Sequence, residues 1–332
     1  MLELRQRRNG GIGVDRVRWF DRVLVLTTVL VAVVNLLPLG ARLGWALDLT
    51  SHFRLQYLAV TVAMLAAVAL RRQWRAAAVL VVAGAVSAAP VLPYVPQLGA
   101  AATAHSPDGR VTVATVNVSY RQFSARRLLE ILDDTAPDVV LIVEYTPHAQ
   151  EVLAALDTRY PHSFKLPAEG PYGIAIWSRF EFEKAGLFSL GRIPAIEARV
   201  RAPSGVFTLL GVHLSAPTSP RRGGQRNEQL KLLATYRAGI AGPVAVAGDF
   251  NITPYSPFYT DWLAASGLTD TRRHRTLSVS WPAILPIVGI PIDHVAVSDE
   301  FDILAHRRLP NFDSDHYGIV AELALRDGPG SP

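Results

Sequence analysis

The chain contains no cysteine among its 332 residues. This absence excludes disulfide bonds, thiol nucleophiles and metal sites with thiolate ligands. Charged residues are also scarce, at 18%, whereas half of the residues are hydrophobic and the mean hydropathy is +0.22. A composition this apolar is unusual for a wholly soluble protein, so we expect part of the chain to lie in a membrane.

The apolar residues are concentrated near the N-terminus. Crossing the roughly 30 Å hydrocarbon layer takes a helix of about 20 residues. The sequence therefore predicts a transmembrane anchor over residues 1–98, with spans at about residues 22–41, 54–70 and 76–96. The middle stretch is short for a span, and a buried or hairpin-like helix is its alternative.

Arginine residues flank these stretches unevenly and predict a multi-pass orientation. Segments rich in arginine tend to stay in the cytoplasm. Both the N-terminal segment and the loop after the second stretch are rich in arginine, so an odd number of crossings would export the C-terminal region. The arginines concerned are Arg5, Arg7, Arg8, Arg16, Arg18 and Arg22 at the N-terminus, and Arg71, Arg72 and Arg75 in the loop.

Little positive charge remains for the rest of the chain. Residues 1–102 contain 11 arginines and 4 acidic residues, which leaves 22 basic and 24 acidic residues in the remainder. A domain that binds nucleic acid usually carries a concentrated basic face, so nucleic acid is not a favoured partner. The N-terminal charge fits membrane topology and contact with anionic lipid.

A mixed α/β domain is predicted over residues 111–326, after a linker at 99–110 and before a tail at 327–332. Short β-branched runs alternate there with amphipathic segments. Two helices are expected, over residues 124–134 and 226–240. The predicted strands cover residues 111–118, 138–145, 173–178, 196–202, 207–214, 242–251, 293–298 and 317–325.

Polar side chains gather where several of these strands end. Buried strands rarely finish in such groups, although one polar residue alone is usually a cap or a turn. Carboxylate and amide oxygens are the ligands that Mg²⁺ or Mn²⁺ prefers, and Glu144 is the leading candidate. The residues at the strand ends are Asn117, Glu144, His213, Asp249, Asn251, Asp315 and His316.

The motifs that carry these residues occur in a fixed order, as TVNVSY, DVVLIVEY, GVHLSAP, GDFN, IDHV and SDHYG. This order resembles the endonuclease/exonuclease/phosphatase superfamily over nearly all of the C-terminal domain. The resemblance implies an α/β fold, the DNase I-like four-layer α/β sandwich, that follows the three-helix transmembrane anchor. It also implies metal-dependent hydrolysis of phosphate esters.

For the metal, the resemblance places Asn117 beside Glu144 as an amide ligand or a phosphate contact, and Asp315 in the metal site or its water shell. Ser119 stands where nuclease members often carry an acidic residue, which favours one metal ion over two. The alternative for Glu144 is an exposed carboxylate at a strand end.

For catalysis, the resemblance pairs His316 with Asp293, a carboxylate that would fix the imidazole tautomer and raise its basicity. His316 would be the general base or a phosphate-facing imidazole. Asp249 would position the attacking water, Asn251 would bind a phosphate oxygen, and His213 would donate a hydrogen bond to the phosphate. The alternatives are an Asx-turn for Asp249 and Asn251 and a structural role for His213.

An apolar, proline-rich loop at residues 281–291 directly precedes Asp293. It would either contact an acyl or isoprenoid chain or pack on the domain. Three spans followed by an exported domain also resemble the membrane proteins associated with teicoplanin resistance. The function predicted from this resemblance is hydrolysis of a lipid-linked phosphate or pyrophosphate of the cell envelope, such as undecaprenyl pyrophosphate. The expected partners are the bilayer and this lipid, and no protein partner is predicted.

Three other functions are open. A phospholipid phosphodiesterase would use the same chemistry, and a non-catalytic envelope-binding protein would use the same fold. An extracytoplasmic nuclease would need a basic groove. Such a groove could include Arg121, Arg179, Arg192, Arg221 and Arg222.

Overall fold

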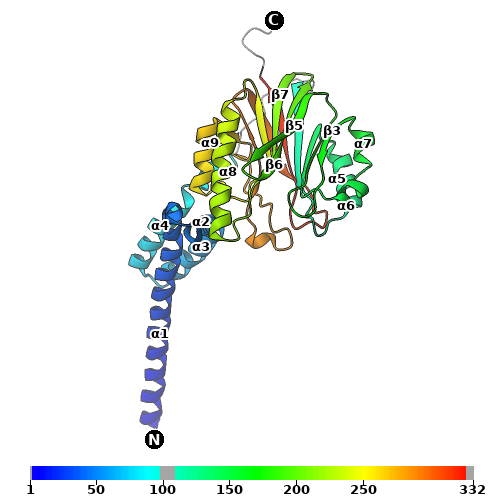
Figure 1. Ribbon diagram of the computed structural model, residues 1–332. Helices are drawn as coiled ribbons and strands as arrows, with labels where there is room; N and C mark the ends of the chain where they lie inside the picture. The colour runs from blue at the N-terminus through cyan, green and yellow to red at the C-terminus, as the bar shows by residue number, and fades with distance from the viewer. Residues whose placement is uncertain (1, 98–108, 327–332) are drawn as a thin grey trace. The chain divides into compact units, whose positions relative to one another are not determined.

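The computed structural model describes residues 2–97 and 109–326. The chain divides into two compact units, Met1–Leu92 and Pro93–Pro332 (Figure 1). Each unit has an apolar core of its own. Most of the predicted linker at 99–110 and the whole predicted tail at 327–332 lie outside the described residues.

In the part of the first unit that the structure describes, the regular elements are all helices. One helical stretch, Trp19–Leu43, is long and apolar enough to cross a membrane. A second candidate consists of two helices with a 63° bend between them, α2 and α3. The elements are α1 (Leu2–Leu36), η1 (Leu37–Leu43), α2 (Trp45–Ser51), α3 (Arg54–Leu70) and α4 (Trp74–Ala88).

The prediction of three separate spans is not supported. The third predicted span, at residues 76–96, contains only the 15-residue helix α4, which ends at Ala88 and is too short to cross a bilayer unaided. Proline at positions 90 and 93 explains this end, because its ring clashes with a preceding turn and it donates no amide hydrogen. The unit thus offers one apolar N-terminal helix, which has the character of a membrane anchor or a signal sequence.

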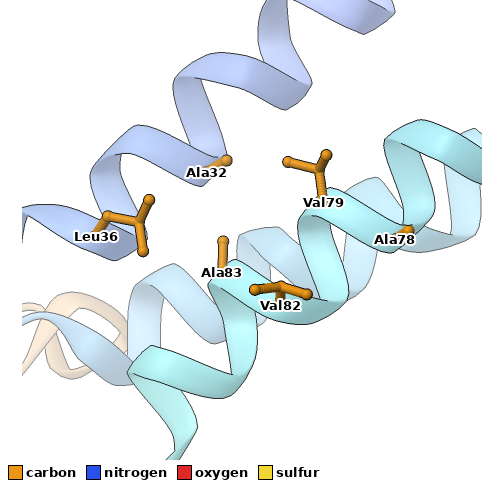
Figure 2. A pocket seen from close by; sticks show the side chains of 6 residues that line it. All are labelled: Ala32, Leu36, Ala78, Val79, Val82 and Ala83. Carbon is orange, nitrogen blue, oxygen red and sulfur yellow. The ribbon is translucent and has the colours of Figure 1, made fainter.

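The first unit presents apolar side chains outward and joins its helices partly through polar ones. Buried Asn35 donates hydrogen bonds to Thr61 Oγ1 at 2.9 Å and to the Val31 carbonyl at 2.8 Å. An apolar groove of about 350 Å³ lies between α1 and α4 (Figure 2). Its lining is formed by Ala32, Leu36, Ala78, Val79, Val82 and Ala83.

The second unit contains two six-stranded sheets. The first has the order β11 (Phe301–Arg308), β12 (Ile319–Leu325), β1 (Arg110–Asn117), β2 (Val139–Val143), β4 (Ile174–Ser178) and β3 (His162–Leu166). The second has the order β5 (Phe182–Leu190), β6 (Ile193–Ala202), β7 (Gly205–His213), β8 (Val244–Asp249), β10 (Asp293–Val297) and β9 (Thr269–Asp270).

The two sheets stack face to face and helices cover their outer faces, as the resemblance implied. Leu141, Leu209 and Val295 belong to one apolar cluster between the sheets. A second apolar cluster joins the first sheet to its helices, and a third joins the second sheet to its helices. Figure 1 shows α5 (Ala125–Thr135), α6 (Pro147–Val152) and α7 (Leu156–Arg159) on one side, and α8 (Pro220–Ala238) and α9 (Pro257–Ser266) on the other.

Helix caps explain where the two predicted helices begin. The Ser124 side chain accepts a hydrogen bond from the Arg127 amide and starts α5 one residue after the predicted position. Helix α8 begins six residues before the predicted start, because Ser219 caps it and Pro220 occupies its first turn. Both helices pack against their sheets and thereby fix the strand ends that carry the candidate site.

Candidate active site

Strand register brings the predicted polar residues together. Across the second sheet, His213 of β7 pairs with Asp249 of β8, and Asp249 pairs with Asp293 of β10. In the first sheet, Asn117 ends β1, and Glu144 directly follows the parallel neighbour β2. Side chains from both stacked sheets therefore meet at one edge of the sandwich.

The backbone at this edge adopts conformations that most residues avoid. Ser119, Glu144 and Asn251 have positive φ angles of 53°, 60° and 50°. A left-handed non-glycine residue costs on the order of 1–3 kcal/mol, and such residues are common at functional sites. Gly248 has φ 141°, and a Cβ there would lie 1.8 Å from the Val212 carbonyl oxygen, so only glycine fits before Asp249.

Asn117 is the hub of the site. Its buried side-chain nitrogen lies 3.1 Å from Glu144 Oε1, 3.1 Å from Asp249 Oδ2 and 3.5 Å from His316 Nε2. Its side-chain oxygen accepts the Ser119 amide at 2.9 Å. Because carboxylates only accept hydrogen bonds, the amide nitrogen must be the group that faces them. Asn117 thus links the carboxylates of the two sheets and presents no free oxygen to them.

The two carboxylates predicted to bind metal have different surroundings. Glu144 is mostly buried: its Oε2 accepts the Tyr120 amide at 2.8 Å, and its Oε1 lies 3.9 Å from His213 Nε2. Asp315 is exposed, and its Oδ2 lies 3.3 Å from the Trp281 indole nitrogen. Glu144 belongs to the central cluster, whereas Asp315 lies with Trp281.

His316 and Asp293 form the predicted pair. His316 Nδ1 lies 2.9 Å from Asp293 Oδ2, and Nε2 lies 3.8 Å from Asp249 Oδ2. Burial lowers the pKa of His316, but the charge and hydrogen bond of Asp293 and the charges of Asp249 and Asp315 outweigh burial and raise this pKa to about 10. The imidazole is therefore charged at neutral pH and suited to face a phosphate.

Asp249 lies between two histidines. Its Oδ2 is 3.6 Å from His213 Nε2, and His213 Nδ1 lies 2.7 Å from the Pro171 carbonyl oxygen, which fixes the ring. Burial and the charge of Asp293 raise the pKa of Asp249 to about 6, against the opposing effects of His316 and His213. Asp249 is thus an unusually basic carboxylate, as a group that orients water needs to be.

The Asx-turn considered for GDFN is present together with the site contacts. Asp249 Oδ1 accepts the Asn251 amide at 2.8 Å, while Asp249 Oδ2 faces the cluster. The Asn251 side-chain nitrogen donates a hydrogen bond to the Leu214 carbonyl at 2.9 Å. The Asn251 backbone carbonyl accepts a hydrogen bond from Arg226 Nη1 at 2.9 Å. These contacts hold the loop after β8 in one conformation.

The cluster fits a divalent cation. Carboxylate oxygens of Asp249 and Asp293 lie within 4.8 Å of each other and of an imidazole nitrogen of His316, which is protonated and therefore is not itself a ligand. Asp293 Oδ1 is buried and, among the residues that the structure describes, has no hydrogen-bond partner. Glu144 adds a third carboxylate close to Asp249 through their shared contact with Asn117. This donor set is rich in hard oxygen ligands, which suits Mg²⁺ or Mn²⁺. It differs from the predicted set of Glu144, Asn117 and Asp315.

Several supporting residues have no motif that could have identified them. Ser280 Oγ accepts the Asp293 amide at 3.1 Å, and Arg272 Nη2 donates to the Asp293 carbonyl at 2.9 Å. Ser314 donates to the Asn117 carbonyl at 2.8 Å. These side chains act on the backbone of site residues, so their role depends on tertiary structure. His294, the neighbour of Asp293, points to the opposite face of β10 and contacts Asp270 at 3.2 Å.

Comparison with known families agrees with this geometry. Residues 114–316, more than half of the chain, match the Endonuclease/Exonuclease/phosphatase family. The chain belongs to this family. Members of the Endonuclease/Exonuclease/phosphatase family hydrolyse phosphoesters, and the matched region begins in β1 and ends at His316. No curated protein matches the chain.

Solved structures share the fold of this family member. The endonuclease/exonuclease/phosphatase from Beutenbergia cavernae is 24% identical, with a TM-score of 0.56 over 67% of this chain and 73% of that one. The protein from Bacteroides vulgatus is 17% identical, with a TM-score of 0.56 over 65% and 99%. D. rerio TDP2, complexed with single strand DNA product, is 16% identical, with a TM-score of 0.57 over 66% and 100%. At these identities the likeness shows the fold alone.

Proposed function

We propose that this protein is a divalent-metal-dependent phosphoesterase that hydrolyses a lipid-linked phosphate or pyrophosphate of the cell envelope. Its apolar N-terminal helix would anchor it in the membrane and hold the catalytic unit outside the cytoplasm. The observation that carries the catalytic part is the position of the Asn117 amide, 3.1 Å from both Glu144 and Asp249, beside the His316 and Asp293 pair. Family members with this fold hydrolyse phosphoesters.

Each residue of the cluster has a chemical task in this proposal. His316, charged at neutral pH, donates a hydrogen bond to a phosphoryl oxygen, and Asp293 keeps it oriented. Asp249 accepts a hydrogen bond from the attacking water. Glu144 and Asp249, with the free oxygen of Asp293, would hold Mg²⁺ or Mn²⁺. When bound, such an ion supplies charge neutralisation at the phosphate and lowers the pKa of water.

The lipid part of the proposal depends on the N-terminal unit. The stretch Trp19–Leu43 is long and apolar enough to span a membrane, and the arginine pattern favours export of the C-terminal region. Topology can be tested by fusing alkaline phosphatase, or a fluorescent protein that folds only in the cytoplasm, after Gly99. Alkaline phosphatase activity would support export, and fluorescence would contradict it.

The central experiment measures phosphate release from undecaprenyl pyrophosphate by the detergent-purified full chain, with Mg²⁺ and with EDTA. Release should require Mg²⁺ and should be lost in His316→Ala. The matched control is His148→Ala, since His148 is exposed on α6. Release that persists in His316→Ala, or no release at all, would contradict the proposed function.

A nuclease is the second candidate, because the similar D. rerio TDP2 was crystallised with single strand DNA product. The scattered arginines offer little support for it. Arg179 follows β4 at the Val139 end of β2, whereas the site lies at the Val143 end. Cleavage of single-stranded DNA that depends on His316, with intact lipid pyrophosphate, would favour the nuclease. Release of a phospholipid headgroup would favour a phospholipid phosphodiesterase, and no turnover of any of these substrates would favour a non-catalytic envelope-binding protein.

A further inference from the structure

A closed apolar loop projects beside the candidate site. Residues 276–292 contain no charged side chain. Within them, Trp281 and Ile290 pair across the neck of a loop: the Trp281 amide donates to the Ile290 carbonyl at 3.0 Å, and the Ile290 amide returns the contact at 2.6 Å. The short helix η4 (Pro286–Val288) forms the tip (orange in Figure 1). Loops with paired ends of this kind are compact and often functional.

The tip of the loop exposes large apolar side chains. The exposed fractions are 88% for Ile284, 52% for Leu285, 81% for Ile287 and 42% for Val288. Packing on the domain, the alternative expected from the sequence, would bury them. In the rest of the second unit, as far as the structure describes it, large exposed apolar side chains occur singly, at Val95, Tyr120, Leu187 and Leu232. A contiguous exposed apolar cluster usually marks a binding surface.

The base of the loop is held firmly, so the exposure of the tip does not come from a loose chain. Arg272 is fully buried, and its guanidinium donates to the Ser278 carbonyl at 2.6 Å and to the Asp293 carbonyl at 2.9 Å, on opposite sides of the loop. Ser280 Oγ also accepts the Ile292 amide at 3.0 Å and the Asp293 amide at 3.1 Å. A fixed neck presents the tip without the entropic cost of ordering it on contact.

The same neck contacts Asp315, the residue next to His316 of the candidate site. The Trp281 indole nitrogen lies 3.3 Å from Asp315 Oδ2, and the Ala283 amide donates to the Asp315 carbonyl at 2.8 Å. His316, the next residue, pairs with Asp293 at the other end of the loop. A molecule held at the tip would therefore lie near the site and need not cross the domain to reach it.

The chain also enters the second unit next to this loop. The Pro93 carbonyl accepts the His274 amide at 2.8 Å, and the Gln97 amide donates to the His274 carbonyl at 3.1 Å. Tyr94, between them, is buried with its ring 6.0 Å from that of Tyr255. The first residues of the second unit, Pro93–Gln97, are thus held at His274, which lies two residues before the uncharged stretch that begins at Thr276.

We propose that the tip residues Ile284–Val288 insert into the apolar layer of a lipid bilayer and so bring the candidate site to lipid headgroups. The absence of charge over residues 276–292 removes the main penalty for entering lipid, and exposed Arg273 beside it suits an anionic headgroup. Insertion itself does not depend on the proposed function; the resulting preference for lipid-held phosphate esters does.

The cysteine-free sequence allows a direct test in the full chain. Ile287→Cys introduces a single thiol, which is labelled with an environment-sensitive fluorophore after reconstitution into phosphatidylcholine and phosphatidylglycerol vesicles. Some of these lipids carry a nitroxide on the acyl chain, which quenches fluorophores within the apolar layer. Leu187→Cys is the matched control, because Leu187 is also apolar and exposed, on edge strand β5. We expect at least threefold stronger quenching at 287 than at 187, and equal quenching at both would overturn the proposal.

A second test places a charge at the tip of the loop. Ile284→Asp, combined with Ile287→Cys, should abolish the excess quenching, and unchanged quenching would overturn insertion. With unlabelled protein, Ile284→Asp should lower turnover of vesicle-held undecaprenyl pyrophosphate at least fivefold and leave turnover of a water-soluble p-nitrophenyl phosphodiester unchanged. An equal loss on both substrates would contradict the role of the loop in lipid access. Strong quenching at 287 with no lipid turnover in any variant would support insertion while rejecting the proposed function.

Discussion

His316 donates from Nδ1 to Asp293 Oδ2 at 2.9 Å, and this contact joins the loop before β12 to the first residue of β10. Nδ1 must be the donor, because the carboxylate can only accept. The contact holds the imidazole with Nε2 toward Asp249 and keeps its charge at neutral pH. The orientation of the His316 imidazole and its charge therefore both depend on Asp293.

Asp293→Asn should therefore lower the pKa of His316 and reduce kcat by about 10²–10⁴-fold, the usual contribution of a positioned acid or base. The pKa can be followed by NMR titration of the imidazole carbon-bound hydrogens. Asp299→Asn is the control, because Asp299 is exposed just after β10. An unchanged pKa of His316 in Asp293→Asn would contradict the assigned cause.

The raised pKa of His316 also predicts a stability change with pH. Its folded value of about 10 lies above the ordinary 6.5, so its stabilising effect is complete below pH 6.5 and is lost as pH rises through 10. The free energy of unfolding of the metal-free protein should exceed that of His316→Gln by an amount that shrinks over this range. Urea unfolding in EDTA at several pH values measures it, and a constant difference would show that His316 has no raised pKa.

Asp249 should set the acid side of the activity profile. Its pKa of about 6 means that the carboxylate proposed to accept a hydrogen bond from water is protonated below this pH, so kcat should rise as pH passes through 6. Saturating Mg²⁺ should move this rise to lower pH, because a nearby cation favours the carboxylate. Asp249→Asn should remove most of the activity at every pH. If kcat of this variant still rises as pH passes through 6, the rise belongs to a group other than Asp249.

Glu144→Gln should weaken activation by Mg²⁺. The substitution keeps the size of the side chain and removes its charge beside Asn117. We expect the Mg²⁺ concentration for half-maximal activity to increase about 10- to 100-fold. Glu151→Gln on α6 is an exposed control. An unchanged Mg²⁺ requirement would place the cation away from Glu144.

Gly248→Ala should destabilise the second unit and disturb Asp249. A Cβ at residue 248 would meet the Val212 carbonyl oxygen at 1.8 Å, so β7 and β8 must separate. Backbone strain of about 1–3 kcal/mol predicts a Tm lower by several degrees. Gly186→Ala is the control, since its Cβ would meet nothing within 4 Å. Equal Tm values in both variants would contradict the steric argument.

The central strands of the two sheets in the second unit could be predicted from sequence, and the edge strands could not. All eight predicted strands form. The four that were missed, β3, β5, β9 and β11, are the edge strands of the two sheets. An edge strand is open to solvent and can be polar, so it lacks the apolar run that reveals a buried strand. The strand β5 illustrates this, with exposed Glu183 and Lys184 in its sequence.

The sequence predicted which residues would gather at the candidate site better than it predicted how their side chains contact one another. Ordered motifs pointed to Asn117, Asp249 and His316, and the structure places these three side chains within 3.1–3.8 Å of one another. Spacing along the sequence could not show that the Asn117 nitrogen faces the carboxylates, nor that Asp315 turns to Trp281. In the first unit, hydropathy predicted three spans, and one helical stretch, Trp19–Leu43, is long and apolar enough to be one. The third was overestimated, because average hydropathy does not show where proline ends a helix.

The backbone is left-handed at Ser119, Glu144 and Asn251, and this conformation lowers the stability of the edge of the domain that carries the candidate site. Ser119 and Glu144 oppose the local preference of their residue types, whereas asparagine tolerates this conformation at residue 251 better than most residues do. Glycine would relax the backbone at residues 144 and 251, but it would remove the Glu144 carboxylate proposed to hold a cation and the Asn251 amide that fixes the loop after β8. A stabilising substitution at either position would therefore cost this edge a polar side chain, so stability and the proposed activity cannot both be optimised at these residues.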